Sequence, residues 1–501
     1  MQDLLVVIPA MKKNAVIPDQ LIKKLDGITL IQRAIDTTKK LTKNSNIIVL
    51  TDSEEISLIS KRNGVDFYYD NKISLNSNNI IDISSKLTKE LKQKNILIYR
   101  ANSPLVNNEI LAKAYQLFLE DESAVLISVR HENKRLLKKG EEISIYIDKD
   151  NYFEEVKSFV IFSKEKIQES NLKPFIVDDE KSIEIENYQD WWVCEKILQR
   201  KRIVFNVIGS IEIGMGHIYH SLALAHEITD HEVIFVCNEK YKIAVDKIAS
   251  MDYKVISANN VEDVIIGLNP DMVINDVLNT EISYIFRLRE CNIKIVNFED
   301  LGEGSKYADI VFNELYDTPQ LEGKNYYWGY KYLILRDEFY SAKSHEFIND
   351  IKEIIVTFGG TDQNNLTLIS LKSILDSCKE KNIIINIVCG GAYKYKNDLK
   401  NYIDNCNYSR INLTYESGII SGIMEKSQLA ISSNGRTVYE LADMNIPSII
   451  ISHHEREHTH NFASLEKGFI NLGVIKNSTE EEVRESFDKL IEDLDYRGLL
   501  F

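Results

Sequence analysis

The sequence lacks the features that mark secreted, membrane-spanning and disulfide-stabilised proteins. No apolar run approaches the length of a membrane span, although 44% of the 501 residues are apolar. The first residues, MQDLLVVIPAM, lack the basic start and small-residue cleavage site of a signal peptide, and they predict a β-strand. The six cysteines show no paired spacing, which argues against zinc sites and disulfide frameworks. We therefore expect a cytoplasmic protein.

Positive charge is also scarce. The chain has 60 Lys and Arg residues against 76 Asp and Glu residues, a formal net charge of −16. This balance argues against a nucleic-acid or anionic-membrane surface. A local pocket on an acidic protein can still be positive, so nucleotide-sized anions remain candidate ligands.

The first 200 residues alternate apolar strands with amphipathic helices. This pattern predicts an α/β fold with a parallel sheet covered on both faces. The expected strands are 4–9, 47–52, 96–100 and 124–130, and the expected helices are 30–41, 54–63 and 108–119. Ligands of such sheets lie beyond the carboxyl ends of the strands. The candidate site residues at these ends are Lys12, Lys13, Asp52, Arg100, Asn102 and Ser103.

The polar, alternating residues 135–160 suggest an extension of the sheet or a dimerisation flap, and the protein can be a homodimer. Residues 182–198 predict a strand tip followed by a helix. The basic joint QRKR, 199–202, places a domain boundary near residue 200.

The rest of the chain repeats the same alternation twice. One series of strands is expected at 203–208, 232–237, 254–257, 272–275, 292–298 and 308–314. A second series is expected at 353–360, 383–391, 411–415, 429–433 and 447–452. Each series opens with a strand and a glycine-rich turn, which predicts two lobes, 201–340 and 341–501, with a cleft between them.

The stretch 203–228 is the strongest local signal for a site. A strand, a glycine-punctuated turn and a helix would direct the free N–H groups of the helix at an anion. Gly214 and Gly216 let the backbone lie close to a ligand. His217 falls in the first turn of the helix, where the dipole should favour its neutral, proton-accepting form. The alternative is that His217 only caps its own loop.

Five segments in order, GMGHIYHSLALAHEI, PDMVINDV, GYKYLILRDEF, VTFGGTDQNNLT and SSNGRTVYELADMNIPSIII, resemble the UDP-sugar hydrolases of the pseudaminic acid pathway. These belong to the two-lobed (GT-B, MurG-like) superfamily, and the resemblance spans about 203–475. It implies hydrolysis of the bond between the anomeric carbon and the UDP oxygen. His217 would activate the water, without a cofactor, and the C-terminal lobe would hold UDP.

Residue chemistry is compatible with this resemblance. Backbone N–H groups and Thr361 can bind a diphosphate, Arg436 supplies positive charge, and Glu440 can accept ribose hydroxyls. The candidate UDP-sugar-binding residues are Gly214, Gly216, Gly359, Gly360, Thr361, Asp362, Asn434, Gly435, Arg436, Thr437, Glu440, Glu455 and Arg456. Arg436 and Glu440 can also be ordinary exposed helix charges. The histidines of 453–460 lack metal-ligand spacing and are better explained as a polar loop than as a metal site.

Two departures leave the reaction open. The hydrolases usually carry an arginine three residues after the histidine, where this chain has His220. Their proline after the aspartate of the second turn is Gln363 here. A related cleft can transfer a sugar instead of releasing it.

The first 200 residues resemble the CMP-sialic acid synthetase-type (acylneuraminate) cytidylyltransferases, through VVIPA, IPDQLIKKLDGITLIQRAI, LTDSEEI, ANSPL and EIENYQDWWVCE. The resemblance implies a Rossmann-like (GT-A-like) nucleotidyltransferase domain that takes CTP, a nonulosonic acid and Mg²⁺. Met11 and Ala15 stand where the family has the basic residues that hold the triphosphate. Residues implied for CTP or the sugar are Pro9, Ala10, Lys12, Lys13, Arg100, Asn102 and Ser103, and those for the metal are Glu186 and Asp190.

We therefore expect a two-module enzyme of nonulosonic (sialic-acid-like) sugar biosynthesis. The cytidylyltransferase-like module, 1–200, is either active or degenerate. The alternatives are a GT-B glycosyltransferase and a non-catalytic scaffold that binds sugar nucleotides.

Overall fold

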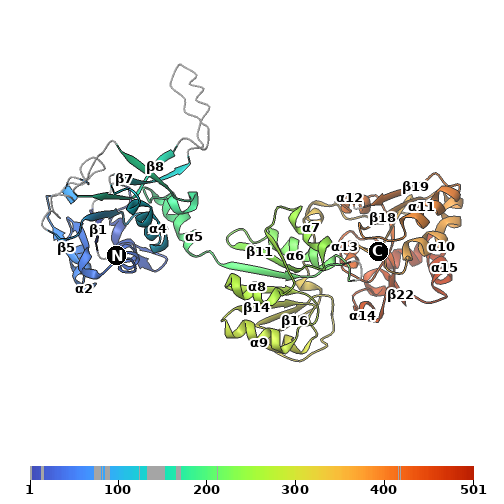
Figure 1. Ribbon diagram of the computed structural model, residues 1–501. Coiled ribbons are helices and arrows are strands. Elements are labelled where there is room, and N and C mark those ends of the chain that lie inside the picture. Colours follow the sequence, from blue (N-terminus) through green and yellow to red (C-terminus); the bar gives the residue numbers. More distant parts are fainter. Residues whose placement is uncertain are drawn as a thin grey trace, which may run out of the picture. The chain divides into compact units, whose positions relative to one another are not determined.

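The computed structural model of this chain divides into two compact units, residues 1–200 and 201–501. It describes residues 3–12, 16–72, 81, 83–84, 91–122, 124–131, 153–164, 171–210, 213–415, 417 and 419–501. Within these ranges, no helix is both long and apolar enough to cross a membrane. Both units are α/β folds, so the predicted fold class is confirmed (Figure 1).

Unit 1 is built on a seven-stranded sheet with the strand order β5-β4-β1-β6-β8-β7-β9. Its strands are β1 (Leu4–Pro9), β4 (Ile47–Thr51), β5 (Asp66–Tyr69), β6 (Asn95–Tyr99), β7 (Val125–His131), β8 (Phe153–Ser163) and β9 (Leu172–Ile176). The hairpin β2 (Lys24–Leu25) and β3 (Ile28–Thr29) stands apart from this sheet. The helices are α1 (Leu30–Lys39), α2 (Glu54–Arg62), α4 (Asn108–Leu119) and α5 (Tyr188–Leu198).

The sheet of unit 1 is mixed, because β8 lies between β6 and β7 and is antiparallel to both. The prediction of a parallel sheet holds for β1, β4, β5 and β6 only. Residues 153–163 thus form an inner strand of the sheet, whereas residues 132–152, where the flap was predicted to begin, lie outside the described part. The predicted strand tip before α5 is wrong, because residues 183–187 form no strand and follow a 3-10 helix at residues 179–182.

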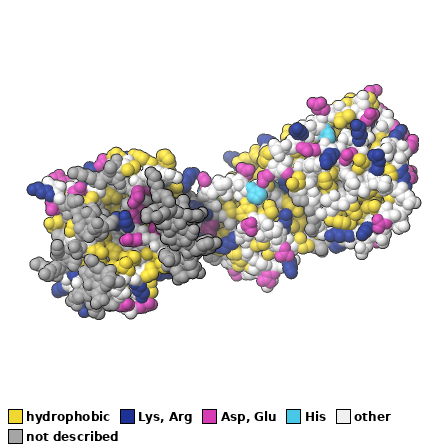
Figure 2. Space-filling model, turned by 90° about the horizontal axis from the view of Figure 1, so that it is seen from above, with side chains coloured by type: hydrophobic (Ala, Val, Ile, Leu, Met, Phe, Trp, Pro, Cys, Tyr) yellow, Lys and Arg dark blue, Asp and Glu magenta, His cyan; other side chains and the backbone are white. Residues whose placement is uncertain are grey.

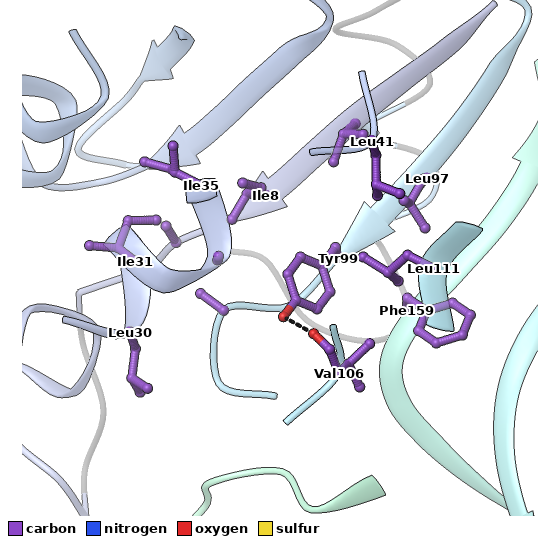
Figure 3. Close-up of a cluster of buried hydrophobic side chains, with 14 of the residues drawn as sticks. Ile8, Leu30, Ile31, Ile35, Leu41, Leu97, Tyr99, Val106, Leu111 and Phe159 are labelled. Carbon is purple, nitrogen blue, oxygen red and sulfur yellow. Dashed lines mark hydrogen bonds between the residues drawn. The ribbon is translucent and has the colours of Figure 1, made fainter. Parts of the chain in front are cut away.

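The core of unit 1 is formed where α1 and α4 cover the sheet. Ile31 and Ile35 lie one helical turn apart on α1 and are fully buried. They share the cluster with Ile8 of β1 and Leu97 of β6 (Figure 3). The buried hydroxyl of Tyr99 donates to the carbonyl oxygen of Val106 at 3.0 Å, which satisfies its polar group inside the core.

The N-terminal lobe of unit 2 is a parallel sheet with the order β12-β11-β10-β13-β14-β15-β16. Its strands are β10 (Arg202–Val207), β11 (Glu232–Asn238), β12 (Val255–Ala258), β13 (Met272–Asp276), β14 (Lys294–Phe298), β15 (Ile310–Asn313) and β16 (Tyr326–Trp328). Its helices are α6 (Gly216–His226), α7 (Lys242–Ala249), α8 (Val261–Leu268) and α9 (Ile282–Glu290).

The C-terminal lobe is a second parallel sheet, with the order β19-β18-β17-β20-β21-β22. Its strands are β17 (Glu353–Thr357), β18 (Ile384–Cys389), β19 (Ile411–Tyr415), β20 (Leu429–Ser432), β21 (Ser448–Ser452) and β22 (Phe469–Val474). Its helices are α10 (Leu366–Lys381), α11 (Lys396–Asn405), α12 (Ser421–Met424), α13 (Thr437–Asp443), α14 (Glu455–His458), α15 (Thr479–Glu492) and α16 (Leu494–Leu500).

Both lobes have the doubly wound strand order, in which the first strand is central and the chain then reverses direction across the sheet. Ligands of such sheets lie beyond the carboxyl ends of the strands, near this reversal. The reversal falls beside β10 in the first lobe and beside β17 in the second, the two strands that precede the glycine-rich turns. On the face shown in Figure 2, acidic and basic side chains are interspersed over residues 201–501.

Candidate functional site

A cavity of about 460 Å³ in unit 2 is lined by residues of both lobes. The first lobe contributes the turn after β10 and the start of α6. The second lobe contributes the turns that follow β17 and β20 and the segment around α14. The candidate site is thus enclosed by loops at the carboxyl ends of two separate sheets.

The glycine-rich turns after β10 and β17 lie close to each other. Gly214 has φ +94° and Gly359 has φ +72°, conformations that side chains with a Cβ rarely adopt. A Cβ placed on Gly360 would lie 3.3 Å from the Cβ of Met215, so the turn after β17 has little room for a side chain where it meets the turn after β10. The backbone therefore forms much of the cavity wall at this point.

His217 lies in the first turn of α6 and is 6% exposed. Its Nδ1 lies 2.6 Å from Oδ1 of Asp276, the last residue of β13. A carboxylate accepts from Nδ1–H, which leaves Nε2 of the neutral ring as a proton acceptor. Nε2 lies 3.9 Å from Oε2 of Glu299. This arrangement of carboxylate and imidazole suits general-base chemistry.

The prediction that the helix dipole favours neutral His217 is wrong in direction. Burial opposes protonation of this ring, but the adjacent carboxylate of Asp276 outweighs it and the pKa of His217 is raised. Burial likewise opposes ionisation of Asp276, yet His217 and His220 hold the pKa of this carboxyl well below its usual value. The ion pair, absent from the sequence-based argument, decides the sign.

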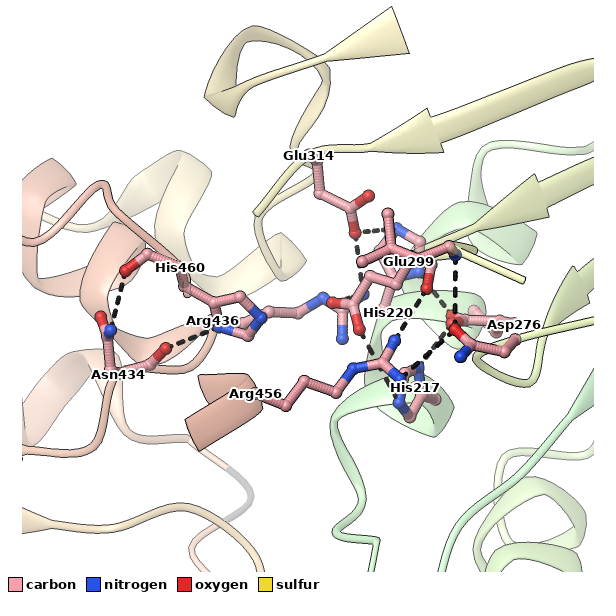
Figure 4. Close-up of polar contacts among 12 residues, drawn as sticks. His217, His220, Asp276, Glu299, Glu314, Asn434, Arg436, Arg456 and His460 are labelled. Atoms are coloured by element: carbon pink, nitrogen blue, oxygen red, sulfur yellow. Dashed lines mark hydrogen bonds and ion pairs between the residues drawn. The ribbon is translucent and has the colours of Figure 1, made fainter. Parts of the chain in front are cut away.

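Three acidic residues lie at the carboxyl ends of three neighbouring strands and meet at one edge of the first lobe (Figure 4). They are Asp276, the last residue of β13, Glu299 after β14 and Glu314 after β15. Arg436 of the second lobe reaches between two of them. Its Nη2 lies 3.0 Å from Glu299 and 2.8 Å from Glu314. These acids were not predicted, although each comes directly at or after an apolar strand, the signal that could have identified them.

Several residues at the cavity have left-handed backbone conformations that are costly for side chains other than glycine. Leu278 has φ 66° and Glu299 has φ 50°, and both line the cavity. Asp362, next to the lining residue Thr361, has φ 41°. Such conformations are typical of ligand-binding and catalytic sites.

The structure brings most of the predicted UDP-sugar-binding residues to the cavity wall. The lining residues are Gly214, Gly216, His217, Gly359, Gly360, Thr361, Gly435, Arg436, Thr437, Glu440 and Arg456. Three predicted residues do not line it. Asp362 accepts from the backbone N–H groups of Leu366 and Thr367 at the start of α10.

The other two residues that do not line the cavity are Asn434 and Glu455. Asn434 is buried and donates to the carbonyl oxygens of Glu457 and His460, so it joins two loops instead of facing a ligand. Glu455 is exposed in the first turn of α14.

Glu440 is held by Arg336, a residue that the sequence did not single out. Nε of Arg336 lies 2.8 Å from Oε1 of Glu440, and its Nη1 lies 3.0 Å from Glu338. Burial raises the pKa of Glu440, although the ion pair with Arg336 acts in the opposite direction. Glu440 is therefore a buried, paired carboxyl and not an ordinary exposed helix charge.

The histidine-rich segment lines the cavity as separate side chains. Burial lowers the pKa of His453 to about 4, and the Nδ1–H of His460 donates to the carbonyl oxygen of Asn434 at 2.9 Å. Within the described residues, no group of three or more His, Cys, Asp or Glu side chains is arranged to hold a metal.

In unit 1, the predicted CTP-binding residues Pro9, Ala10 and Lys12 lie at the carboxyl end of β1, and Lys13 lies outside the described residues. The backbone N–H of Lys12 donates to Asp52 at 2.7 Å. Its ammonium group lies 3.3 Å from Glu55 and 3.5 Å from Asp19. Lys12, predicted to bind CTP, is thus already paired with two acids.

The turn after β6 contains Arg100, Asn102 and Ser103, and it meets the segment before α5. The backbone N–H of Ile185 donates to the carbonyl oxygen of Asn102 at 2.8 Å. This contact brings the predicted sugar-binding turn beside the predicted metal ligands. Oδ2 of Asp190 accepts from the backbone N–H groups of Glu186 and Asn187, so this oxygen caps α5 and is not available to a metal.

Known proteins resemble parts of this chain. It is 33% identical over 267 residues to an uncharacterized protein of Methanocaldococcus jannaschii, covering 49% of this chain and 54% of that protein. It is 24% identical over 270 residues to the spore coat polysaccharide biosynthesis protein SpsG of Bacillus subtilis, covering 50% and 76%. It is 25% identical over 241 residues to the pseudaminic acid cytidylyltransferase and UDP-2,4-diacetamido-2,4,6-trideoxy-beta-L-altropyranose hydrolase of Helicobacter pylori, covering 46% and 43%. The chain thus spans about half the length of the first of these relatives.

Solved structures with partial similarity include CMP-2-keto-3-deoxy-manno-octonic acid synthetase with CTP, at 10% identity and a TM-score of 0.32, covering 39% of this chain and 98% of that chain. Another is MurG of Acinetobacter baumannii, at 12% identity and a TM-score of 0.42, covering 60% and 92%. Within this chain, residues 5–197 match the family model of the cytidylyltransferases.

Proposed function

We propose that residues 201–501 hydrolyse a UDP-sugar in the biosynthesis of a nonulosonic acid. The substrate class is a UDP-2,4-diacetamido-trideoxyhexose, the class named for the Helicobacter relative. The products are UDP and the free sugar. The observation that carries the proposal is the pair of His217 and Asp276, which sits at a cavity walled by two glycine-rich turns.

In the proposed reaction, Nε2 of His217 takes a proton from water as the water oxygen bonds to the anomeric carbon. The bond between this carbon and the UDP oxygen breaks, and its electron pair leaves with UDP. Asp276 holds the ring through Nδ1–H and stabilises the imidazolium that forms. The proton then passes from Nε2 to solvent.

Arg436 is the best placed cation for the diphosphate. Its Nη2 is held by Glu299 and Glu314, whereas Nε is buried with no hydrogen-bond partner in the described part of the chain. Arg436 lines the cavity, and a guanidinium group there favours a bound diphosphate. Gly359, Gly360 and Thr361, whose backbone N–H groups can donate to a diphosphate, line the same cavity.

The test is UDP release from the UDP-2,4-diacetamido-trideoxyhexose with no acceptor present. We expect turnover by the native chain and a loss of roughly 10²- to 10⁴-fold in His217→Ala, the usual contribution of a general base. UDP affinity, measured by calorimetry, should stay nearly unchanged.

A matched control is His226→Ala. His226 lies on the same helix, and its Nδ1 lies 2.7 Å from Asp337, but it does not line the cavity. Full activity of His217→Ala would eliminate its role as base, and absence of turnover in the native chain would eliminate the hydrolase.

A second candidate is sugar transfer, favoured by a separate hollow of about 640 Å³ in the first lobe. Its lining includes the uncharged polar side chains of Asn206, Asn238 and Tyr284, which suit an acceptor with hydroxyl groups, together with charged residues such as Lys240 and Glu262. Asn279 lines it and also accepts from Arg456 of the main cavity, so the two hollows are neighbours. Transfer would make UDP release depend on an acceptor.

For unit 1 we propose cytidylyl transfer from CTP to the nonulosonic acid. Mg²⁺ would be held by Glu186 and the remaining oxygen of Asp190, a small ligand set that agrees with the preference of Mg²⁺ for one or two carboxylates plus phosphate oxygens. When bound, the ion would neutralise the charge on the triphosphate. Arg100 and Asn102 would position the sugar acid.

A further inference from the structure

The carboxylate behind His217 is shared with a second imidazole. His220 lies one helical turn after His217 on α6, and its Nδ1 is 2.7 Å from Oδ2 of Asp276. The hydroxyl of Ser221 donates to the same oxygen at 3.1 Å. Asp276 is fully buried, so each of its oxygens faces one histidine and no solvent.

His220 does not take part in ligand contacts through this nitrogen. Its side chain is fully buried, and its ring edge packs against Phe298 with ring centroids 4.6 Å apart. Among the residues that the structure describes, Nε2 has no hydrogen-bond partner, and it lies 3.8 Å from Glu314. A buried polar ring with one unsatisfied nitrogen costs stability, which argues against a purely structural role.

We propose that His220 is a positioning residue, which divides the Asp276 carboxylate between two imidazoles and so fixes His217 with Nε2 towards the cavity. The proposal rests on the proposed function of His217 as the base. It also gives a role to the residue found where the resembling hydrolases carry an arginine.

The physical consequence concerns proton affinity. Asp276 is the main group that raises the pKa of His217 against the effect of burial. Each N–H or O–H that donates to Asp276 offsets part of its negative charge, and therefore weakens its attraction for the imidazolium. Removing the donor on Oδ2 should raise the pKa of His217 further, and the proton-accepting form would then be scarcer at neutral pH.

Other charges face this pair from each neighbouring element. Glu299, after β14, and Arg436, at the start of α13, act on His217 with opposite signs. Glu314, after β15, faces His220. None of these groups donates to Asp276 in the described structure. Substitutions at His220 therefore change the hydrogen bonds that Asp276 accepts without removing these charges.

The experiment uses the full chain and follows the titration of His217 directly, by NMR of histidine labelled with ¹³C at Cε1. The chain has ten histidines, so His217 can be assigned by its loss in His217→Ala. We compare the native chain with His220→Leu, which has no donor, and His220→Asn, whose side-chain amide can donate to Oδ2. Ser221→Ala removes the weaker donor. Because this change is milder, it tests the proposal even if His220→Leu does not fold.

We expect His217 to titrate at higher pH in His220→Leu, to shift less in the same direction in Ser221→Ala, and to remain near its native value in His220→Asn. The acid limb of the pH profile of kcat/KM should move to higher pH together with the titration of His217. At neutral pH, we expect kcat/KM of His220→Leu to fall roughly tenfold. UDP affinity should be unchanged. His226→Leu, the control on the same helix, should not change the pH at which His217 titrates.

An unchanged His217 titration in folded His220→Leu and Ser221→Ala would overturn the proposal, as would His220→Asn behaving like His220→Leu. If the titrations shift as expected but the native chain releases no UDP, the positioning role stands and the hydrolase fails. The two proposals are therefore tested by separate measurements.

Discussion

Glu457 is a buried carboxyl on the wall of the cavity. It is 9% exposed, and Oε2 accepts from the backbone N–H of His453 at 2.5 Å. Burial raises the pKa of Glu457 to about 7, although the hydrogen bond from His453 lowers it. In the folded state this residue therefore holds a proton at pH values where the unfolded chain has lost it.

The sign of the pH dependence follows from this raised pKa. The stability that the protonated Glu457 contributes is complete below 4.5, its ordinary value, and is lost as the pH rises through about 7. Glutamine stays neutral, so it does not lose this stability. As the pH rises from 5 to 8, the free energy of unfolding of Glu457→Gln should gain roughly 1–3 kcal/mol relative to that of the native chain.

Chemical denaturation of the unit that contains residue 457, at both pH values, measures this gain. Glu455→Gln, an exposed position on the same helix, is the control and should show no such gain. A constant difference between Glu457→Gln and the native chain across this range would contradict the assigned protonation.

At the scale of elements, α10 depends on a cap that the sequence suggested was a ligand contact. The two carboxylate oxygens of Asp362 lie 2.7 Å and 2.8 Å from the backbone nitrogens of Leu366 and Thr367. We expect Asp362→Ala to lower the free energy of unfolding by roughly 1–2 kcal/mol, as for other caps. UDP affinity should remain unchanged, because Asp362 does not line the cavity.

The neighbouring residue should behave in the opposite way. Thr361 lines the cavity, so Thr361→Val should weaken UDP binding roughly tenfold, the loss of one hydrogen bond to a charged group, with little effect on stability. Calorimetry with UDP and denaturation curves of both variants provide the measurement. If UDP binding were weakened in Asp362→Ala and not in Thr361→Val, the predicted role of Asp362 as a UDP contact would be supported.

The elements of unit 2 could be predicted because local patterns specify them. Apolar runs separated by amphipathic helices indicate parallel strands, and glycine followed by histidine marks a turn into a helix. The predicted position of His217 in the first turn of α6 agrees with the structure. What depends on distant segments was not predictable in this way. Asp276 lies 59 residues from His217, and only the pairing of β10 with β13 brings them together.

Unit 1 shows the same limit in its sheet. The parallel strands β1, β4 and β6 follow from local sequence, but the position of β8 between β6 and β7 depends on long-range pairing. The ion pairs of Lys12 with Asp19 and Glu55 show the same limit. A motif comparison considers each residue separately and does not show which residues pair in the folded chain. Charge in a site is a property of the assembled fold.

At the scale of the whole molecule, each cluster of buried apolar side chains takes its members from one unit. The clusters of unit 1 draw on residues 4–198, and those of unit 2 draw on residues 203–500. Dividing the chain between Arg200 and Lys201 would also keep the contacts at the start of unit 2. The carbonyl oxygen of Lys201 accepts from Glu232, and Arg202 begins β10.

We therefore expect a chain of residues 201–501 to fold alone and to release UDP at the rate of the full chain, because the cavity and both histidines of α6 lie within it. Its thermal unfolding should reproduce one of two transitions of the full chain, and a chain of residues 1–200 should reproduce the other. Calorimetry of the three chains, with UDP release measured in parallel, tests this, and His217→Ala in the shorter chain is the control for background release. A folded but inactive 201–501 chain would mean that unit 1 supplies part of the site, and the proposed division of labour between the two units would then be wrong.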